Sequence, residues 1–303
     1  MNNRDDKDSL AHITIPQEAF DWYDEYAHGD IDRRTFMKRL ATLGIAGLTL
    51  STLSGMLLPD YALAEQVSFN DPDIKARYLE FDAPTGHEKG RGYLVVPQGV
   101  SAENPAPAVL VAHENRGLNP YIEDVARRLA KSGFVAFAPD ALFPLGGYPG
   151  NDDDGRAMQK TLERSKIEGD FADAARMLTA YELTTDKLGM VGFCFGGYLA
   201  NQLAAMLGDM IDAAVPFYGT PPHSPVMNIK AAMQLHFAGL DNRVNGFWPK
   251  YETALKAAKI NYTAFIYPDV NHGFHNDSTA RYDEKSAELA WSRTLAFFHQ
   301  HLD

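Results

Sequence analysis

The chain of 303 residues contains a single cysteine, so it can form no internal disulfide bond. Basic residues are also scarce, with 28 Lys and Arg against 40 Asp and Glu. The resulting net charge of −12 argues against nucleic acid and anionic membrane surfaces as partners. The sequence has no internal repeat and no low-complexity tract. Its uncharged run, residues 41–58, is interrupted by Gly, Ser and Thr, which argues against stable insertion in a membrane.

Short apolar runs alternate with amphipathic segments from about residue 76 onward. The runs expected to form strands are 77–82, 91–97, 108–113, 134–138, 188–191, 213–217, 232–237 and 262–267. The segments expected to form helices are 120–132, 156–165, 171–183, 198–207, 248–258 and 284–302. Strands alternating with helices predict an α/β fold, in which a mostly parallel central sheet has helices on both faces. The first two strands form an expected hairpin at its edge.

The stretch 187–200 predicts a strand, a sharp turn and a helix, with the only cysteine at the apex of the turn. Gly192 and Gly196 stand two residues before and two after Cys194, where glycine lets the crossing backbones approach closely. The pattern G-x-C-x-G is that of a nucleophile elbow with Cys in the place of Ser. The N-terminal dipole of the following helix favours the thiolate. The alternative is a small buried residue on a strand.

Two further polar residues follow later strands, as Asp241 follows 232–237 and His272 follows 262–267. In a parallel sheet the reactive groups lie at the C-terminal ends of the strands. The order Cys194, Asp241, His272 is that of nucleophile, acid and base in the α/β-hydrolase fold. In such a triad Cys attacks a carbonyl, His transfers protons, and Asp holds and stabilises the imidazole.

Each of these residues has an alternative interpretation. Asp241 alone is also typical of a helix N-cap, and Asp269 is a rival acid close to His272. His272 alone is also compatible with a packed loop histidine. His272-x-x-His275 together with Asp277 suggests a metal site, but the spacing is loose and no further ligand pair supports it. We therefore predict no metal and no cofactor.

The chain resembles the dienelactone hydrolase family of α/β hydrolases, the carboxymethylenebutenolidase-like enzymes, from about residue 76 to the C-terminus. The matching segments are Glu114-Asn115-Arg116-Gly117, Gly192-Phe193-Cys194-Phe195-Gly196-Gly197, Gly239-Leu240-Asp241, His272-Gly273-Phe274 and residues 287–298. The resemblance implies hydrolysis of a carboxylic ester or lactone through a thioester. It also implies that Glu114 hydrogen-bonds the resting thiol and takes its proton when the substrate arrives.

The same resemblance suggests which groups bind the substrate. We expect the oxyanion hole to consist of the backbone N–H groups of Phe195 and Asn115. The founding enzymes of the family bind a carboxylated lactone with arginines near the active site. This chain has no arginine after His272 until Arg281, and Arg116 is the other weak candidate. Ester or lactone hydrolysis is therefore expected, whereas the natural substrate stays open.

Residues 1–64 differ from the rest of the chain. Arg33-Arg34, followed by Phe36 and Lys38, precedes the uncharged run and a small-x-small motif that ends at Ala64. This arrangement resembles a Tat signal, so we expect export through the Tat translocon, cleavage after Ala64 and a periplasmic hydrolase domain of residues 65–303. Asp32 stands where Ser or Thr is usual, and the acidic leader is long. The alternative is a retained helical extension, with a helix over 16–28, on a cytoplasmic protein.

The leading expectation is a hydrolase that acts on a small-molecule ester or lactone. One alternative is a thioesterase or cysteine peptidase on the same fold. The other is a non-catalytic binding module in which residues 1–64 dock a partner. The oligomeric state is not predicted.

Overall fold

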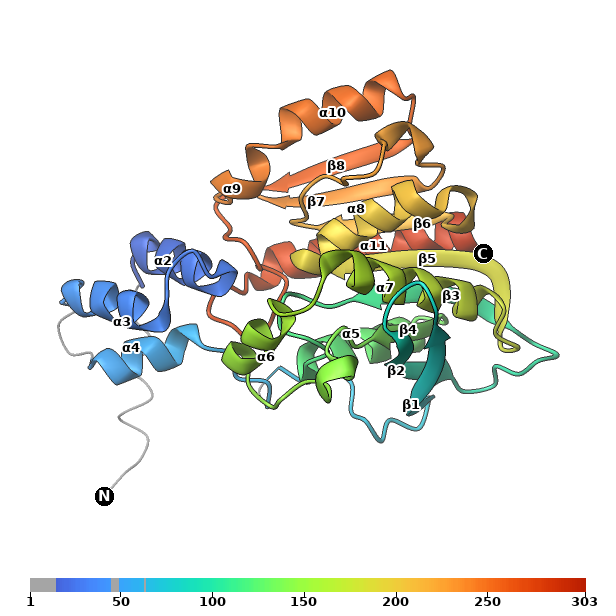
Figure 1. Cartoon of the computed structure of the whole chain (residues 1–303), viewed down its shortest axis with the longest axis horizontal. Helices are drawn as coiled ribbons and strands as arrows, with labels where there is room; N and C mark the ends of the chain where they lie inside the picture. Colours follow the sequence, from blue (N-terminus) through green and yellow to red (C-terminus); the bar gives the residue numbers. More distant parts are fainter. Residues whose placement is uncertain (1–14, 45–48, 63) are drawn as a thin grey trace. The chain divides into compact units, whose positions relative to one another are not determined.

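The computed structural model describes residues 15–44, 49–62 and 64–303, and these residues separate into two units. The smaller unit contains the described residues up to Pro59 together with Thr279–Arg281. The larger unit contains Asp60–Ser278 and Tyr282–Asp303. Figure 1 traces the chain through both units.

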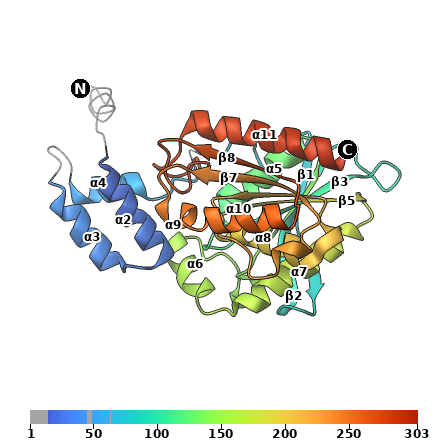
Figure 2. The ribbon, with the colours of Figure 1, turned by 90° about the horizontal axis from the view of Figure 1, so that it is seen from above.

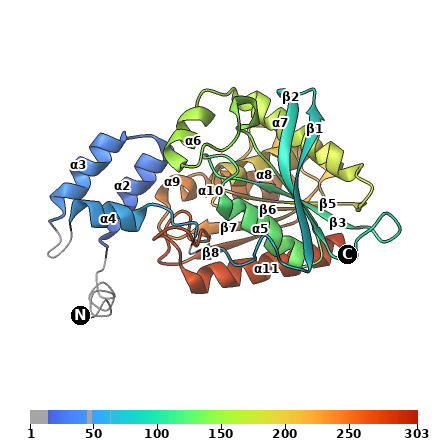
Figure 3. The same ribbon diagram turned by 90° about the horizontal axis from the view of Figure 1, so that it is seen from below.

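The larger unit is built on one eight-stranded sheet. Its strands are β1 (Ile74–Ala83), β2 (Glu88–Pro97), β3 (Ala106–Ala112), β4 (Val135–Pro139), β5 (Thr184–Phe193), β6 (Ala213–Phe217), β7 (Ala232–Ala238) and β8 (Tyr262–Tyr267). They are arranged in the order β1-β2-β4-β3-β5-β6-β7-β8. The six strands from β4 to β8 in that order are parallel, whereas the β1–β2 hairpin is antiparallel and lies at the opposite end of the sheet from β7 and β8 (Figure 3). The expected sheet and its edge hairpin are confirmed.

Helices cover both faces of this sheet. They are α5 (Pro120–Lys131), α6 (Asp152–Gln159), α7 (Arg164–Thr179), α8 (Phe195–Leu207), α9 (Asn242–Asn245), α10 (Trp248–Ala257) and α11 (Glu284–Leu302), with 3-10 turns at Phe143–Leu145, Gly208–Met210 and Val226–Asn228. The apolar side chains of α5 and α11 pack into the core on one face, and those of α7, α8 and α10 pack into the core on the other. Figure 2 shows α11 along one side of the sheet and α8 and α10 along the other. The two cores explain why the central strands are apolar without interruption.

The parallel strands bring the expected site residues to one edge. Glu114 follows β3, Cys194 follows β5, Asp241 follows β7 and His272 follows β8. Because these strands are parallel, the segments that leave their C-terminal ends meet at the same edge of the sheet. β6, which lies between β5 and β7, delivers Tyr218 to that edge as well.

Two helices differ from expectation at both ends. The predicted helix over 156–165 is instead α6, which begins at Asp152 because the Asn151 side chain accepts a hydrogen bond from Asp154 N–H. The predicted helix over 171–183 is instead α7, which already begins at Arg164 and passes through Gly169. A Cβ on Gly169 would lie 2.3 Å from Thr85 O, so this glycine permits a close approach of two backbones and does not break the helix.

The smaller unit consists of α2 (Gln17–His28), α3 (Arg33–Thr42) and α4 (Leu50–Leu57), together with the short 279–281 segment. The expected helix over 16–28 is present. Its buried Tyr26 ring stacks on Phe36 of α3 at 4.9 Å, and Leu53 and Leu57 of α4 join the same core. The twin arginines are the first two residues of α3, and Asp32 caps that helix by accepting from Thr35 N–H at 2.7 Å.

Residues 45–48 of the predicted signal and Leu63 of its cleavage motif lie outside the described residues. Within the described part of the chain, no helix is both long enough and apolar enough to cross a membrane.

Candidate active site

The turn at Cys194 is the tightest feature of the candidate site. Cys194 has a φ of 56°, a left-handed conformation that costs free energy for a residue with a side chain. A Cβ on Gly192 would lie 1.9 Å from Gly196 O, and one on Gly197 would lie 2.4 Å from Phe217 O. The glycines around the turn are therefore required by the close approach of β5, β6 and α8. The elbow expected from the sequence has this geometry.

The structure brings Asp241 and His272 into direct contact. His272 Nδ1 lies 2.6 Å from Asp241 Oδ2, and both side chains are buried. A ring nitrogen of His272 lies within 4.8 Å of Cys194 Sγ. The three residues that the sequence selects are thus neighbours, and His272 is close to both Cys194 and Asp241.

Asp241 has two partners at once, because it also begins α9. Its Oδ1 accepts from Val244 N–H at 3.0 Å, while Oδ2 contacts His272. The helix cap that the sequence suggests as an alternative is therefore compatible with contact to the histidine. Burial opposes ionisation of Asp241, but the charge of His272, the hydrogen bonds from His272 and Val244, and the charge of Arg243 outweigh it and lower the pKa of Asp241. The carboxylate is therefore charged at neutral pH.

Glu114 is buried at the end of β3, and its partner comes from the loop that carries His272. Glu114 Oε2 accepts from Asn276 Nδ2 at 2.9 Å. Asn276 is fully buried, and its Oδ1 accepts from Ser278 N–H at 3.1 Å and from Ser278 Oγ at 2.6 Å. Asp60 N–H in turn donates to Ser278 O. A continuous series of hydrogen bonds therefore holds the Glu114 carboxylate to this loop.

The two expected oxyanion donors belong to segments that pack tightly against each other. Phe195 is the first residue of α8, and Asn115 follows Glu114. A Cβ on Gly196 would lie 2.0 Å from Ala112 O and 2.8 Å from His113 O. The N-terminus of α8 thus contacts the end of β3, which places the peptide groups of Phe195 and Asn115 in neighbouring segments.

The two arginines expected near the substrate are buried and already have partners. Arg116 Nη1 lies 2.5 Å from Asp152 Oδ2. Arg281 belongs to the smaller unit, where its guanidinium lies 4.7 Å over the Tyr23 ring and 3.5 Å from Asp24 Oδ1. Either arginine would have to leave these contacts before it could bind a substrate carboxylate.

The rival acid and the residues of the suggested metal site have other surroundings. Asp269, the rival acid, is exposed, and it is Asp241 that contacts His272. His275 Nδ1 is bound to Tyr121 OH at 2.7 Å. Asp277 forms an ion pair with Arg128 at 2.5 Å.

Sequence reasoning missed three residues of this site. The Tyr218 ring lies 4.8 Å from the His272 ring, Arg243 Nη2 lies 3.5 Å from His272 Nδ1, and Asn276 holds Glu114. Tyr218 follows β6, so applying the strand-end rule to every strand would have found it. Arg243 lies two residues after Asp241 in the same turn. Asn276 carries no comparable signal, because its partner is distant in the sequence.

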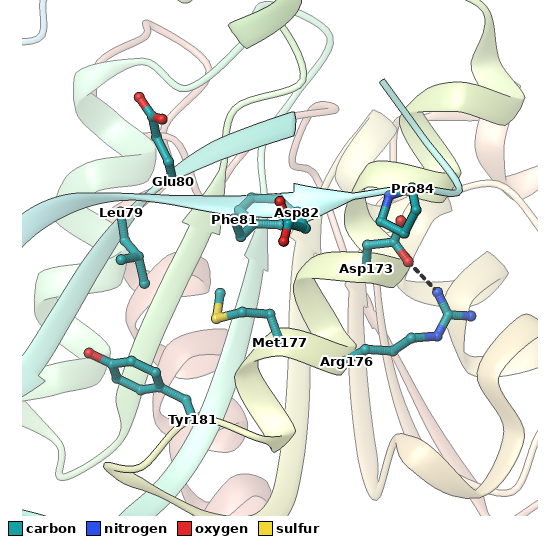
Figure 4. A pocket seen from close by; sticks show the side chains of 9 residues that line it. All are labelled: Leu79, Glu80, Phe81, Asp82, Pro84, Asp173, Arg176, Met177 and Tyr181. Atoms are coloured by element: carbon teal, nitrogen blue, oxygen red, sulfur yellow. Dashed lines mark hydrogen bonds and ion pairs between the residues drawn. The ribbon is translucent and has the colours of Figure 1, made fainter. Parts of the chain in front are cut away.

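A separate open cavity of about 560 Å³ lies between β1 and α7 (Figure 4). Its lining residues are Leu79, Glu80, Phe81, Asp82, Pro84, Asp173, Arg176, Met177 and Tyr181. None of the candidate site residues lines it. Asp173 and Arg176 at its rim are paired with each other at 2.6 Å, so their charges are mutually neutralised.

Comparison with known proteins relates most of the chain to one family. The model of the dienelactone hydrolase family matches residues 91–302, and a model described as YqhI-like matches residues 8–46. A protein of Escherichia coli named "Putative hydrolase fragment YghX" is 56% identical over 116 residues, which cover 38% of this chain and 97% of that protein. A protein of Aquifex aeolicus named "Putative carboxymethylenebutenolidase" is 34% identical over 230 residues, covering 71% of this chain and 94% of the relative.

The solved structures that match this chain include a protein titled as a dienelactone hydrolase. The crystal structure titled "Putative Dienelactone Hydrolase", from Klebsiella pneumoniae, matches with a TM-score of 0.64 and 27% sequence identity. The match covers 75% of this chain and all of that one.

The contact between Glu114 and Asn276 predicts that a substitution of Asn276 makes the free energy of unfolding depend on pH. Asn276→Asp would place two buried carboxyls together, so we expect it to lower the free energy of unfolding by about 3 kcal/mol at pH 7, where both tend to ionise. The deficit should shrink as the pH falls towards 4, because one carboxyl then takes up a proton in the folded state. Urea unfolding of the variant and the wild type at several pH values measures this difference in the free energy of unfolding. Asn276→Ala is the control, since it removes the hydrogen bond without adding a second carboxyl, so its deficit should be smaller than that of Asn276→Asp and should vary less with pH over this range. An equal deficit of Asn276→Asp at all pH values would contradict the assignment.

Proposed function

The chain belongs to the dienelactone hydrolase family and is an ester or lactone hydrolase, and we propose that its reaction runs through a thioester on Cys194. The observation that carries this proposal is the 2.6 Å contact between Asp241 and His272, with Cys194 Sγ within 4.8 Å of the same imidazole. Because Asp241 engages Nδ1, Nε2 is the nitrogen that serves the reacting atoms.

The acylation step begins with proton transfer from the Cys194 thiol to the Glu114 carboxylate as substrate enters. The thiolate attacks the carbonyl carbon, and the N–H groups of Phe195 and Asn115 stabilise the resulting oxyanion. The bond from the carbonyl carbon to the leaving oxygen then breaks. Charged His272, held by Asp241, gives its Nε2 proton to a leaving alkoxide and becomes neutral.

The deacylation step restores the starting state. Neutral His272 takes a proton from water, and the hydroxide attacks the thioester carbon. The bond from carbon to sulfur breaks, the carboxylic acid leaves, and the Cys194 thiolate regains its proton from Glu114. An enolate released from an enol-lactone is a stable anion that needs no proton from the enzyme, so charged His272 instead loses its proton to solvent, and the neutral imidazole then accepts the proton of the attacking water. No step requires a cofactor.

Two alternative functions share parts of this site. A thioesterase or cysteine peptidase would use the same three residues, but enol-lactones and activated esters suit a thiolate nucleophile better than an amide does. A binding module would have no need of a buried Asp241 held to His272 at 2.6 Å.

Ester hydrolysis by the full chain tests the proposal. Purified protein is assayed with p-nitrophenyl acetate and a panel of enol-lactones, with Cys194→Ala and Glu114→Gln beside it. We expect Cys194→Ala to abolish turnover, Glu114→Gln to slow acylation by about 100-fold, and lactones to be preferred. Turnover that survives in Cys194→Ala would contradict the thioester. Absence of turnover in the wild type on every ester and lactone would favour the binding module.

The localisation is a second proposal, supported by the twin-arginine motif: we propose that the chain is exported. Cleavage after Ala64 has a structural consequence, because Ala64 is buried in the larger unit and Arg128 Nη2 lies 3.5 Å from its carbonyl oxygen. It would also remove Tyr23 and Asp24, the partners of Arg281.

The N-terminal residue of the protein isolated from its native cells decides between processing and retention. We expect Glu65 if the segment is an export signal. Met1 or Asn2 would contradict cleavage and favour a retained helical unit.

A further inference from the structure

His113 is a buried histidine that the reaction described above does not use. It is the first residue after β3 and is completely buried, with its ring against the edge of Phe171. Both ring nitrogens are bound to backbone atoms. Nδ1 lies 2.5 Å from the carbonyl oxygen of Glu114, and Ala141 N–H donates to Nε2 at 3.1 Å.

These two contacts determine which nitrogen carries the proton. Nε2 accepts from Ala141 N–H, so it has a lone pair and no hydrogen. The imidazole proton is therefore on Nδ1, which donates it to Glu114 O. Burial lowers the pKa of His113 and outweighs the charge of nearby Asp140, which keeps the ring neutral and preserves this tautomer.

The hydrogen bond to Glu114 O also orients the next N–H group. The peptide bond between Glu114 and Asn115 is trans, so its C=O and N–H point in opposite directions from one rigid plane. Holding the carbonyl towards His113 holds the Asn115 N–H on the other side. This N–H is one of the two donors assigned to the oxyanion. A rotation of this plane would turn a carbonyl oxygen towards the developing negative charge.

We propose that His113 is a positioning residue that locks the Glu114–Asn115 peptide group, and with it half of the oxyanion hole, in the orientation needed for acyl transfer. The inference rests on the proposed function, because it presupposes that Asn115 N–H stabilises the oxyanion. The lock acts only on steps that form an oxyanion. It has no effect on the intrinsic reactivity of the Cys194 thiolate.

The neighbouring backbone explains why a histidine is needed. A Cβ on Gly196 would lie 2.8 Å from His113 O, so α8 closes one side of this residue. On the other side, Asp140 holds the segment that follows β4, since its Oδ1 accepts from Leu142 N–H at 3.0 Å. The neutral imidazole has a donor at Nδ1 and an acceptor at Nε2, and with these two atoms it joins Glu114 O to Ala141 N–H across this space.

Two variants of the full chain separate the two contacts. In His113→Asn the amide nitrogen can take the place of Nδ1 and keep the donor to Glu114 O, whereas His113→Gln keeps a polar group only at the position of Nε2. His236→Asn is the matched control, because His236 is an equally buried histidine whose ring nitrogens are bound to side chains, those of Tyr267, Gln234 and Thr294. Circular dichroism verifies that each variant is folded.

Two reactions of Cys194 provide the readout. Acylation by p-nitrophenyl acetate passes through an oxyanion, whereas alkylation by iodoacetamide does not. We expect His113→Gln to slow acylation by about 100-fold and to leave alkylation at the wild-type rate. His113→Asn should recover acylation to within about tenfold of wild type, and His236→Asn should change neither reaction.

Several outcomes would overturn the proposal for His113. These are acylation of His113→Gln at the wild-type rate, an equal fall in the rates of acylation and alkylation in His113→Gln, or an equal fall in the acylation rate of His236→Asn. If His113→Gln does not fold, a 100-fold loss of acylation in folded His113→Asn overturns it instead. Failure of the proposed function looks different, because the wild type itself would then not be acylated on Cys194.

Discussion

The left-handed turn at Cys194 is the constraint on which the rest of the site depends. A residue with a side chain adopts φ 56° only when its surroundings hold it there, and here β5, β6 and α8 meet through glycine contacts that leave no space for a Cβ. The turn presents the Cys194 side chain at the edge where the six parallel strands end. The other groups then need only short loops to reach it.

The loops at this edge use single residues for two purposes. Asp241 caps α9 with one carboxylate oxygen and holds His272 with the other. Asn276 holds Glu114 with its amide nitrogen and the loop backbone at Ser278 with its oxygen. His113 joins the end of β3 to the segment after β4. Each of these three residues links a side chain or peptide group of the site to the backbone of another segment, so the site is organised before any substrate binds.

Much of this arrangement follows from local sequence patterns, and the remainder depends on contacts between distant segments. All eight strands, the elbow and the order of Cys194, Asp241 and His272 were predictable because strand periodicity and strand-end position are local properties. The early start of α7 was not, since Gly169 looks like a helix breaker until its approach to Thr85 is known. The partners of Arg281 and Glu114 were equally hidden, because Asp24 and Asn276 lie far from them in the chain.

The central claim is that Cys194 becomes acylated, and the most direct measurement is the mass of the enzyme during turnover. The full chain is mixed with an activated ester, quenched with acid within the first turnover, digested and analysed by mass spectrometry. We expect to find one acyl group on the peptide that contains Cys194, and we expect it to disappear as product accumulates. Turnover without any acylated peptide, or an acyl group on another residue that is lost at the rate of turnover, would contradict it.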